Sequence, residues 1–149
     1  MSPTFLCPTH RDWVYFNPQK ALLYIEDSQK EGEVYLQQKN WQKASAFLGC
    51  AFEATEILMT LQQSQQSFLV RRLTSLAVLL SESFRQLNTL NISKLILCHA
   101  EQKLQDAAAK ERDNHSRQDF IMQCIEKIKF YIEGFELNTV ANDFPIQVH

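Results

Sequence analysis

Apolar residues recur every three or four positions along most of the chain, which is the period of an α-helix with one buried face. The clearest stripe has no gap, and its members are Trp41, Ala44, Leu48, Ala51, Thr55 and Leu58. Similar stripes occur at residues 69–87, 97–107 and 121–135, and a weaker one of small and apolar residues occurs at 21–36. The pattern predicts about five amphipathic helices.

Capping residues indicate where the first helices begin and end. Asn17 stands directly before Pro18, and proline is favoured at the first helical position. The first helix is therefore predicted to begin there and to run to about Lys39. Asn40 can cap the second helix, and the polar run at residues 62–67 is expected to connect the second helix to the third.

The later helices carry signals of the same kind. Asn91 and Ser93 both offer capping oxygens for the fourth helix. Ser116, followed three residues later by Asp119, is close to a capping box and predicts the start of the fifth helix. Gly134 is expected to mark the end of that helix.

The two ends of the chain differ from the helical part. Residues 1–16 are dense in aromatic side chains, which are costly to leave in water, so this arm is expected to pack onto the helices. Residues 138–149 alternate apolar side chains around Pro145 and are expected to form an extended tail. The predicted organisation is an N-terminal aromatic arm, a single helical domain at 17–137, and this tail.

Composition supports an all-α fold. The 149 residues include only 3 Gly and 4 Pro, which is too little turn chemistry for many short strands. The chain is 45% hydrophobic and 21% charged, as expected for a folded globular domain and not for a disordered segment.

Charge and cysteine content bear on partners and compartment. The formal net charge of −2 gives no electrostatic reason to expect a nucleic acid or an anionic membrane as partner. The most apolar stretch, at residues 68–80, contains Arg71 and Arg72, and no secretory signal is visible at the N-terminus. We therefore expect a cytoplasmic protein whose four cysteines are reduced.

Within residues 25–58 the sequence resembles the core of a tetratricopeptide repeat. The residues that carry the resemblance are Gly32, Tyr35, Trp41, Ala44, Leu48 and Ala51. Small side chains at such spacing let two antiparallel helices approach closely, while large ones fill the space around them. The chain departs from the family pattern at Ser28, Glu31 and Glu56, where an aromatic residue, a leucine and a proline are usual.

A second copy of part of this pattern occurs on the fourth predicted helix. Ala100, Leu104 and Ala107 repeat the spacing of Ala44, Leu48 and Ala51. The resemblance thus implies two antiparallel hairpins stacked side by side, with the fifth helix as a cap and a concave groove for a partner. The alternative is a closed helical bundle, which hides its apolar faces.

Motifs that would indicate catalysis or a cofactor are absent from the sequence. It contains no glycine-rich phosphate loop, no Gly-x-Ser-x-Gly and no His-Glu-x-x-His, so we expect a protein that is not an enzyme and has no cofactor. One metal site remains as an alternative, because thiolates and imidazoles are zinc ligands. Its residues are Cys7, His10, Cys98 and His99.

The function predicted from these patterns is protein binding, as an adaptor that takes a peptide, a partner protein or a second copy of itself. A chaperone-like adaptor and a small metal-binding protein are the alternatives. Candidate groove residues are polar or aromatic positions off the packing stripes, namely Tyr24, Gln38, Lys43, Phe47, Phe52, Arg72 and Arg85.

Overall fold

The computed structural model describes residues 4–61 and 66–142, and within them the regular elements are all α-helices. The all-α prediction is confirmed, but these residues form six helices where about five were expected. The helices are α1 (Pro8–Phe16), α2 (Pro18–Gln37), α3 (Trp41–Leu61), α4 (Gln66–Gln86), α5 (Leu90–Lys110) and α6 (His115–Asn142).

The additional helix, α1, lies in the N-terminal arm. Pro8 occupies its first turn, and the Sγ atom of Cys7 accepts a hydrogen bond from the backbone N–H of His10. A cysteine is an unusual N-cap, and the apolar residues of this segment are consecutive instead of periodic. Both features hid the helix from pattern reasoning.

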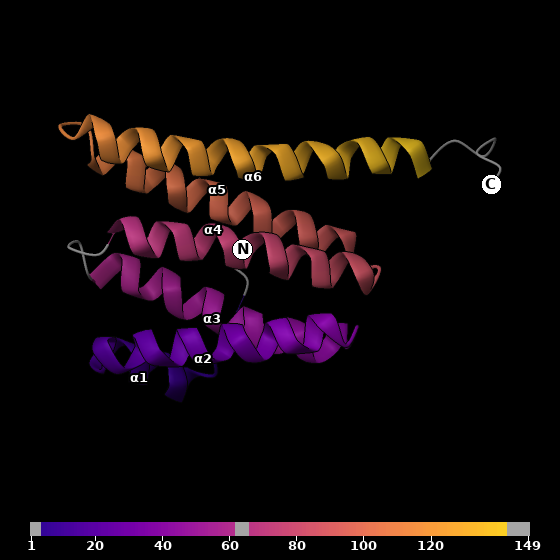
Figure 1. Ribbon diagram of the computed structural model, residues 1–149, viewed down its shortest axis with the longest axis horizontal. Coiled ribbons are helices and arrows are strands. Elements are labelled where there is room, and N and C mark those ends of the chain that lie inside the picture. The colour runs from indigo at the N-terminus through magenta and orange to yellow at the C-terminus, as the bar shows by residue number, and fades with distance from the viewer. Residues whose placement is uncertain (1–3, 62–65, 143–149) are drawn as a thin grey trace.

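Helices α2 to α6 form a stack in which each helix packs against the next along the chain (Figure 1). Helix α4 also packs against α6, and α1 covers part of α2 and α3. Short connections join α2 to α3 and α4 to α5, so each of these pairs is an antiparallel hairpin.

The two hairpins turn in the same way. Lys39 and Asn88 both have φ of 60°, the left-handed conformation that often ends a helix. After each of them a backbone N–H reaches back five residues: Asn40 N–H donates to the Tyr35 carbonyl, and Thr89 N–H to the Phe84 carbonyl. This hydrogen bond satisfies one backbone carbonyl group at the C-terminal end of each helix.

The predicted stripes of α3, α4 and α5 form the core. The largest fully buried aliphatic side chains on these helices are Leu48, Leu58, Leu69, Leu73, Leu76, Leu80, Ile96, Leu97 and Leu104. Gly32 of α2 allows close packing, because a Cβ there would lie 2.6 Å from Cγ of Leu48. Helix α3 is long and apolar enough to cross a membrane, yet 67% of that stretch is buried inside the stack.

The C-terminal expectations need correction. Helix α6 continues through Gly134 to Asn142, so residues 138–142 are helical where an extended tail was expected. Gly134 does not have the positive φ of a helix-ending glycine, so the helix continues through it. Residues 143–149 lie outside the described part of the chain.

Candidate functional site

Residues 4–6 form a non-helical segment with a bend at Leu6, and Glu53 holds this segment across α3. One carboxylate oxygen, Oε1, accepts hydrogen bonds from the backbone N–H groups of Phe5 (2.6 Å) and Leu6 (2.9 Å). Glu53 is only 8% exposed, although it lies on the most apolar helix of the chain. A buried carboxylate needs such partners, because without them its burial would be strongly unfavourable.

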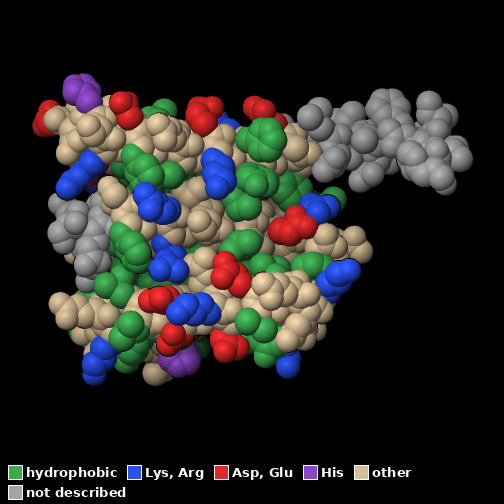
Figure 2. All heavy atoms as spheres, in the orientation of Figure 1, with side chains coloured by type: hydrophobic (Ala, Val, Ile, Leu, Met, Phe, Trp, Pro, Cys, Tyr) green, Lys and Arg blue, Asp and Glu red, His purple; other side chains and the backbone are tan. Residues whose placement is uncertain are grey.

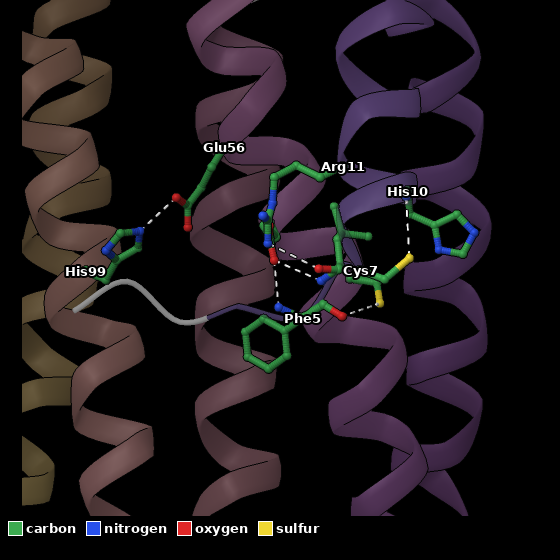
Figure 3. A network of polar contacts seen from close by, with 9 residues as sticks. Phe5, Cys7, His10, Arg11, Glu56 and His99 are labelled. Carbon is green, nitrogen blue, oxygen red and sulfur yellow. Dashed lines mark hydrogen bonds and ion pairs between the residues drawn. The ribbon is translucent and has the colours of Figure 1, made fainter.

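Arg11 of α1 completes this contact from the other side (Figure 3). Its Nε donates to Glu53 Oε2 at 2.8 Å, and its Nη2 donates to the Leu6 carbonyl at 3.2 Å. The hydrogen bond and the charge of Glu53 raise the pKa of the guanidinium. One carboxylate and one guanidinium thus hold both the N–H and the C=O groups of the segment.

The ring of Phe5 rests on Gly49 of α3. A Cβ at Gly49 would lie 2.6 Å from Cε1 of that ring, so only glycine leaves room for it. The Phe84 ring of α4 lies 6.3 Å away between centroids, and the Cys50 thiol contacts the Phe5 carbonyl oxygen at 3.8 Å. We call the space above Gly49 the Phe5 notch.

Tyr24 and Cys50 lie next to each other between α2 and α3, beside the Phe5 notch. Burial raises the pKa of Tyr24 to about 12, and the neighbouring Cys50 thiol adds to this shift. Burial also raises the pKa of Cys50, while a hydrogen bond with Tyr24 partly offsets that effect. A protonated thiol is a poor nucleophile, so this arrangement does not suit covalent catalysis at Cys50.

A groove of mixed charge runs along the same face, between α1, α3 and α5. It consists of two adjoining hollows of about 230 and 130 Å³, which share Glu56, Thr60 and Lys103. We call it the α3/α5 groove, and its other lining residues are Thr4, Arg11, Tyr15, Glu53, Ile57, Met59, Asp106, Ala107, Lys110 and Glu111.

Glu56 and His99 join α3 to α5 beside this groove. His99 Nε2 lies 2.7 Å from Glu56 Oε2, and Figure 3 shows the two side chains pointing toward each other. Both side chains are largely buried, with 14% and 13% of their surface exposed. The contact fixes the spacing of the two helices that form the groove.

A second groove, of about 400 Å³, lies between α4 and α6 and is mainly apolar. Its lining includes Val78, Leu79, Tyr131 and Phe135, and Phe130 stands at its edge with 71% of its surface exposed. Figure 2 shows hydrophobic side chains gathered below α6 on this face. We call it the α4/α6 groove.

Two of the residues predicted to form a binding groove lie on α4. Arg85 lies on the rim of the α4/α6 groove and pairs with Glu82 of its own helix at 2.8 Å. The hydrogen bond from Arg85 lowers the pKa of Glu82. Arg72 donates to Gln29 at 2.8 Å and links α4 to α2.

The other predicted residues lie on α2, α3 and their connection. Lys43 lies 5.4 Å from the centre of the Tyr35 ring, which stacks on Phe47. Gln38 is exposed in the connection. Phe52 is fully buried, so its prediction as a groove residue is wrong and it belongs to the core. The predicted set does not form one surface.

The alternative metal site is not assembled. His99 pairs with Glu56, while Cys7 caps α1. In the part of the chain that the structure describes, no three His, Cys, Asp or Glu side chains are grouped so that they could hold an ion. The alternative in which Cys7, His10, Cys98 and His99 hold a metal is therefore not supported by the described residues.

Comparison with protein-family models, with curated proteins and with solved structures gives no significant match for this chain.

Sequence reasoning missed the residues that hold the N-terminal segment. Glu53 is one signal that was visible in the sequence, because a charged residue within an apolar helix needs a buried partner. Gly49 is a second signal, since glycine in a helix interior costs about 1 kcal/mol relative to alanine and is retained where space is needed. Neither signal names the partner, which lies more than 40 residues earlier in the chain.

Proposed function

We propose that the protein is a non-catalytic scaffold that binds an extended polypeptide segment of a partner protein on the face formed by α1, α3 and α5. The observation that carries the proposal is the seating of residues 4–6 on α3. There the stack already holds a non-helical segment by its backbone groups, through Glu53 and Arg11. Such main-chain contacts are a common basis of peptide recognition.

The α3/α5 groove supports the same function, because it adjoins this segment. Thr4 lines the larger of the two hollows, so a peptide that follows the path of residues 4–6 would continue into that hollow. In the smaller hollow, Lys103 and Lys110 lie beside Asp106 and Glu111. Alternating charges of this kind suit a partner that carries both acidic and basic residues, and they contribute more to specificity than to affinity.

The tetratricopeptide-like arrangement remains part of this proposal. Gly32 packed against Leu48 is the small-to-large contact on which the resemblance rests. The matching turns at Lys39 and Asn88 are consistent with two hairpins of one kind. We interpret α6 as the helix that caps the second hairpin, and we favour this interpretation over a closed bundle because the face between α3 and α5 is hollowed.

Selection from a library of random peptides displayed on phage tests the function. A peptide selected on the wild-type chain should bind about tenfold more weakly to Lys103→Glu and to Lys110→Glu, because each change reverses a charge that lines the groove. Binding is measured by isothermal titration calorimetry. The matched control is Lys127→Glu, an exposed lysine on α6 that lines neither groove.

All three variants should melt within a degree or two of the wild type, since surface substitutions rarely change the free energy of unfolding by more than about 0.5 kcal/mol. The proposal is refuted if no peptide is enriched. It is also refuted if the groove variants bind selected peptides as tightly as the α6 control does.

A further inference from the structure

The site that holds residues 4–6 does not require them to belong to the same chain. We propose that it is a docking site for an aromatic residue followed by an aliphatic one in a non-helical segment of a partner protein, and that Phe5 and Leu6 occupy it in cis. This inference rests on the proposed function, because it names what the same face recognises.

Most polar contacts of the site are made to backbone atoms. Glu53 accepts from the N–H groups of residues 5 and 6, Arg11 donates to the carbonyl of Leu6, and the Cys50 thiol contacts the carbonyl of Phe5. Every polypeptide offers these groups. Sequence preference must therefore come from the two side chains.

Both side chains are seated in shaped spaces. The Phe5 ring lies against the bare backbone of Gly49 and beside Phe84, so a flat side chain fits where a branched one does not. Leu6 is only 4% exposed and belongs to the core cluster. The site therefore selects an aromatic residue followed by an aliphatic one, on a backbone that turns both of their N–H groups toward Glu53.

Exchange of one segment for another leaves no buried charge without a partner. Glu53 keeps its contact with Arg11 at 2.8 Å when residues 4–6 leave, and the N–H groups of the released segment bind water. The incoming backbone then restores the same hydrogen bonds. The cis segment has the advantage of proximity, which for a short tether corresponds to a concentration of about millimolar.

A partner can overcome that advantage by extending its contact. The larger hollow of the α3/α5 groove is lined by Thr4, Glu56 and Lys103, so it adjoins the segment that fills the Phe5 notch. A longer partner segment would fill the Phe5 notch and this groove together. The N-terminal segment thus acts as a competitor that sets a threshold for weak or incomplete partners.

The experiment removes the Phe5 ring from the notch by mutation and then offers a separate peptide that carries the same ring. The protein is the full chain with Phe5→Ala, and the probe is a synthetic peptide that copies residues 1–8 with Cys7→Ser. The probe should bind this variant at least about tenfold more tightly than it binds the wild-type chain, where the cis ring is still present. It should also raise the melting temperature of the variant and not that of the wild type.

Two matched controls isolate the aromatic contact. The same peptide with Phe5→Ala should lose at least about tenfold in affinity for the variant. Adding Gly49→Ala to the protein variant should have a similar effect, because the new Cβ takes the space of the ring. Equal binding of both peptides, or equal binding to the variant and the wild type, would overturn the proposal.

A second measurement covers the case in which Phe5→Ala does not fold. A probe peptide with a photoreactive benzophenone side chain in place of Phe5 is then irradiated in excess with the wild-type chain. Cross-links should concentrate on α3 around Gly49, and cross-links spread over the surface would overturn the proposal. Lys127→Glu on α6, which lines neither groove, should leave binding of the short probe unchanged. Equal binding of the probe and its Phe5→Ala form counts against this proposal, whereas unchanged binding of selected peptides by the Lys103→Glu variant counts against the groove.

Discussion

Two glycines of this chain face large side chains, with different results. Gly32 meets Leu48 between α2 and α3, inside a hairpin whose helices are adjacent in sequence. Gly49 meets Phe5, which comes from a non-helical segment that crosses α3 and reaches Phe84 of α4. The first contact is closed on all sides and belongs to the fold. The second involves a ring that is only partly buried, and under our proposal the same small-to-large contact that builds a core in one place forms an exchangeable site in the other.

Truncating the two large side chains is the strongest test of this comparison. Leu48→Ala should reduce the free energy of unfolding by about 2–5 kcal/mol, because Leu48 is fully buried and the cavity cannot collapse. Phe5→Ala should cost about 1–2 kcal/mol, because the half-buried ring leaves at the edge and opens no enclosed cavity. Chemical denaturation measures both values, and equal losses would contradict the distinction between the two glycines.

Removing the carboxylate that holds the segment should have an intermediate effect. Glu53→Ala leaves the N–H groups of Phe5 and Leu6 without their acceptor and should cost about 1–3 kcal/mol. Glu53→Gln keeps one acceptor oxygen and should cost less. Hydrogen exchange is the second readout, and it should increase at residues 4–6 while α4 and α5 keep their protection. A uniform increase would instead make Glu53 part of the global fold.

The smallest expected effect is a pH dependence of stability that comes from Tyr24, the tyrosine beside the Phe5 notch. The pKa of Tyr24 is raised from the ordinary 10.0 to about 12, so the folded state holds the proton more tightly than the unfolded state does. The stabilisation is therefore complete below pH 10 and is lost as the pH rises toward 12. Ultraviolet titration of tyrosinate should show a step near pH 12 that is absent in Tyr24→Phe. Titration of the chain in urea is the control, and a step near pH 12 that persists there would contradict burial as the cause.

The stack was predictable because its information is local. The stripes around Leu48, Leu76 and Leu104 repeat at helical spacing, and the structure places all three in the core. Periodicity reports which face of a helix is buried, whatever covers it. It therefore gave the helices of the stack but not the end of α6, where Gly134 suggested a stop that the backbone does not make.

The candidate site was not predictable in the same way, because its contacts are distant in sequence. Arg11 and Glu53 are 42 residues apart, and His99 and Glu56 are 43 apart. No spacing rule connects such pairs. The predicted groove residues were chosen for being off the stripes, and Phe52 shows the weakness of that choice, since α3 is buried on more than one face.

The burial of α3 has a consequence for the order of events during protein synthesis. Helix α3 packs against α2 on one side and α4 on the other. When α3 emerges from the ribosome, α2 is already outside, but α4 follows α3 in the sequence and still lies inside the exit tunnel. During that interval one side of this apolar helix has no partner helix, so the nascent chain is most prone to aggregation until α4 has emerged and packed against it.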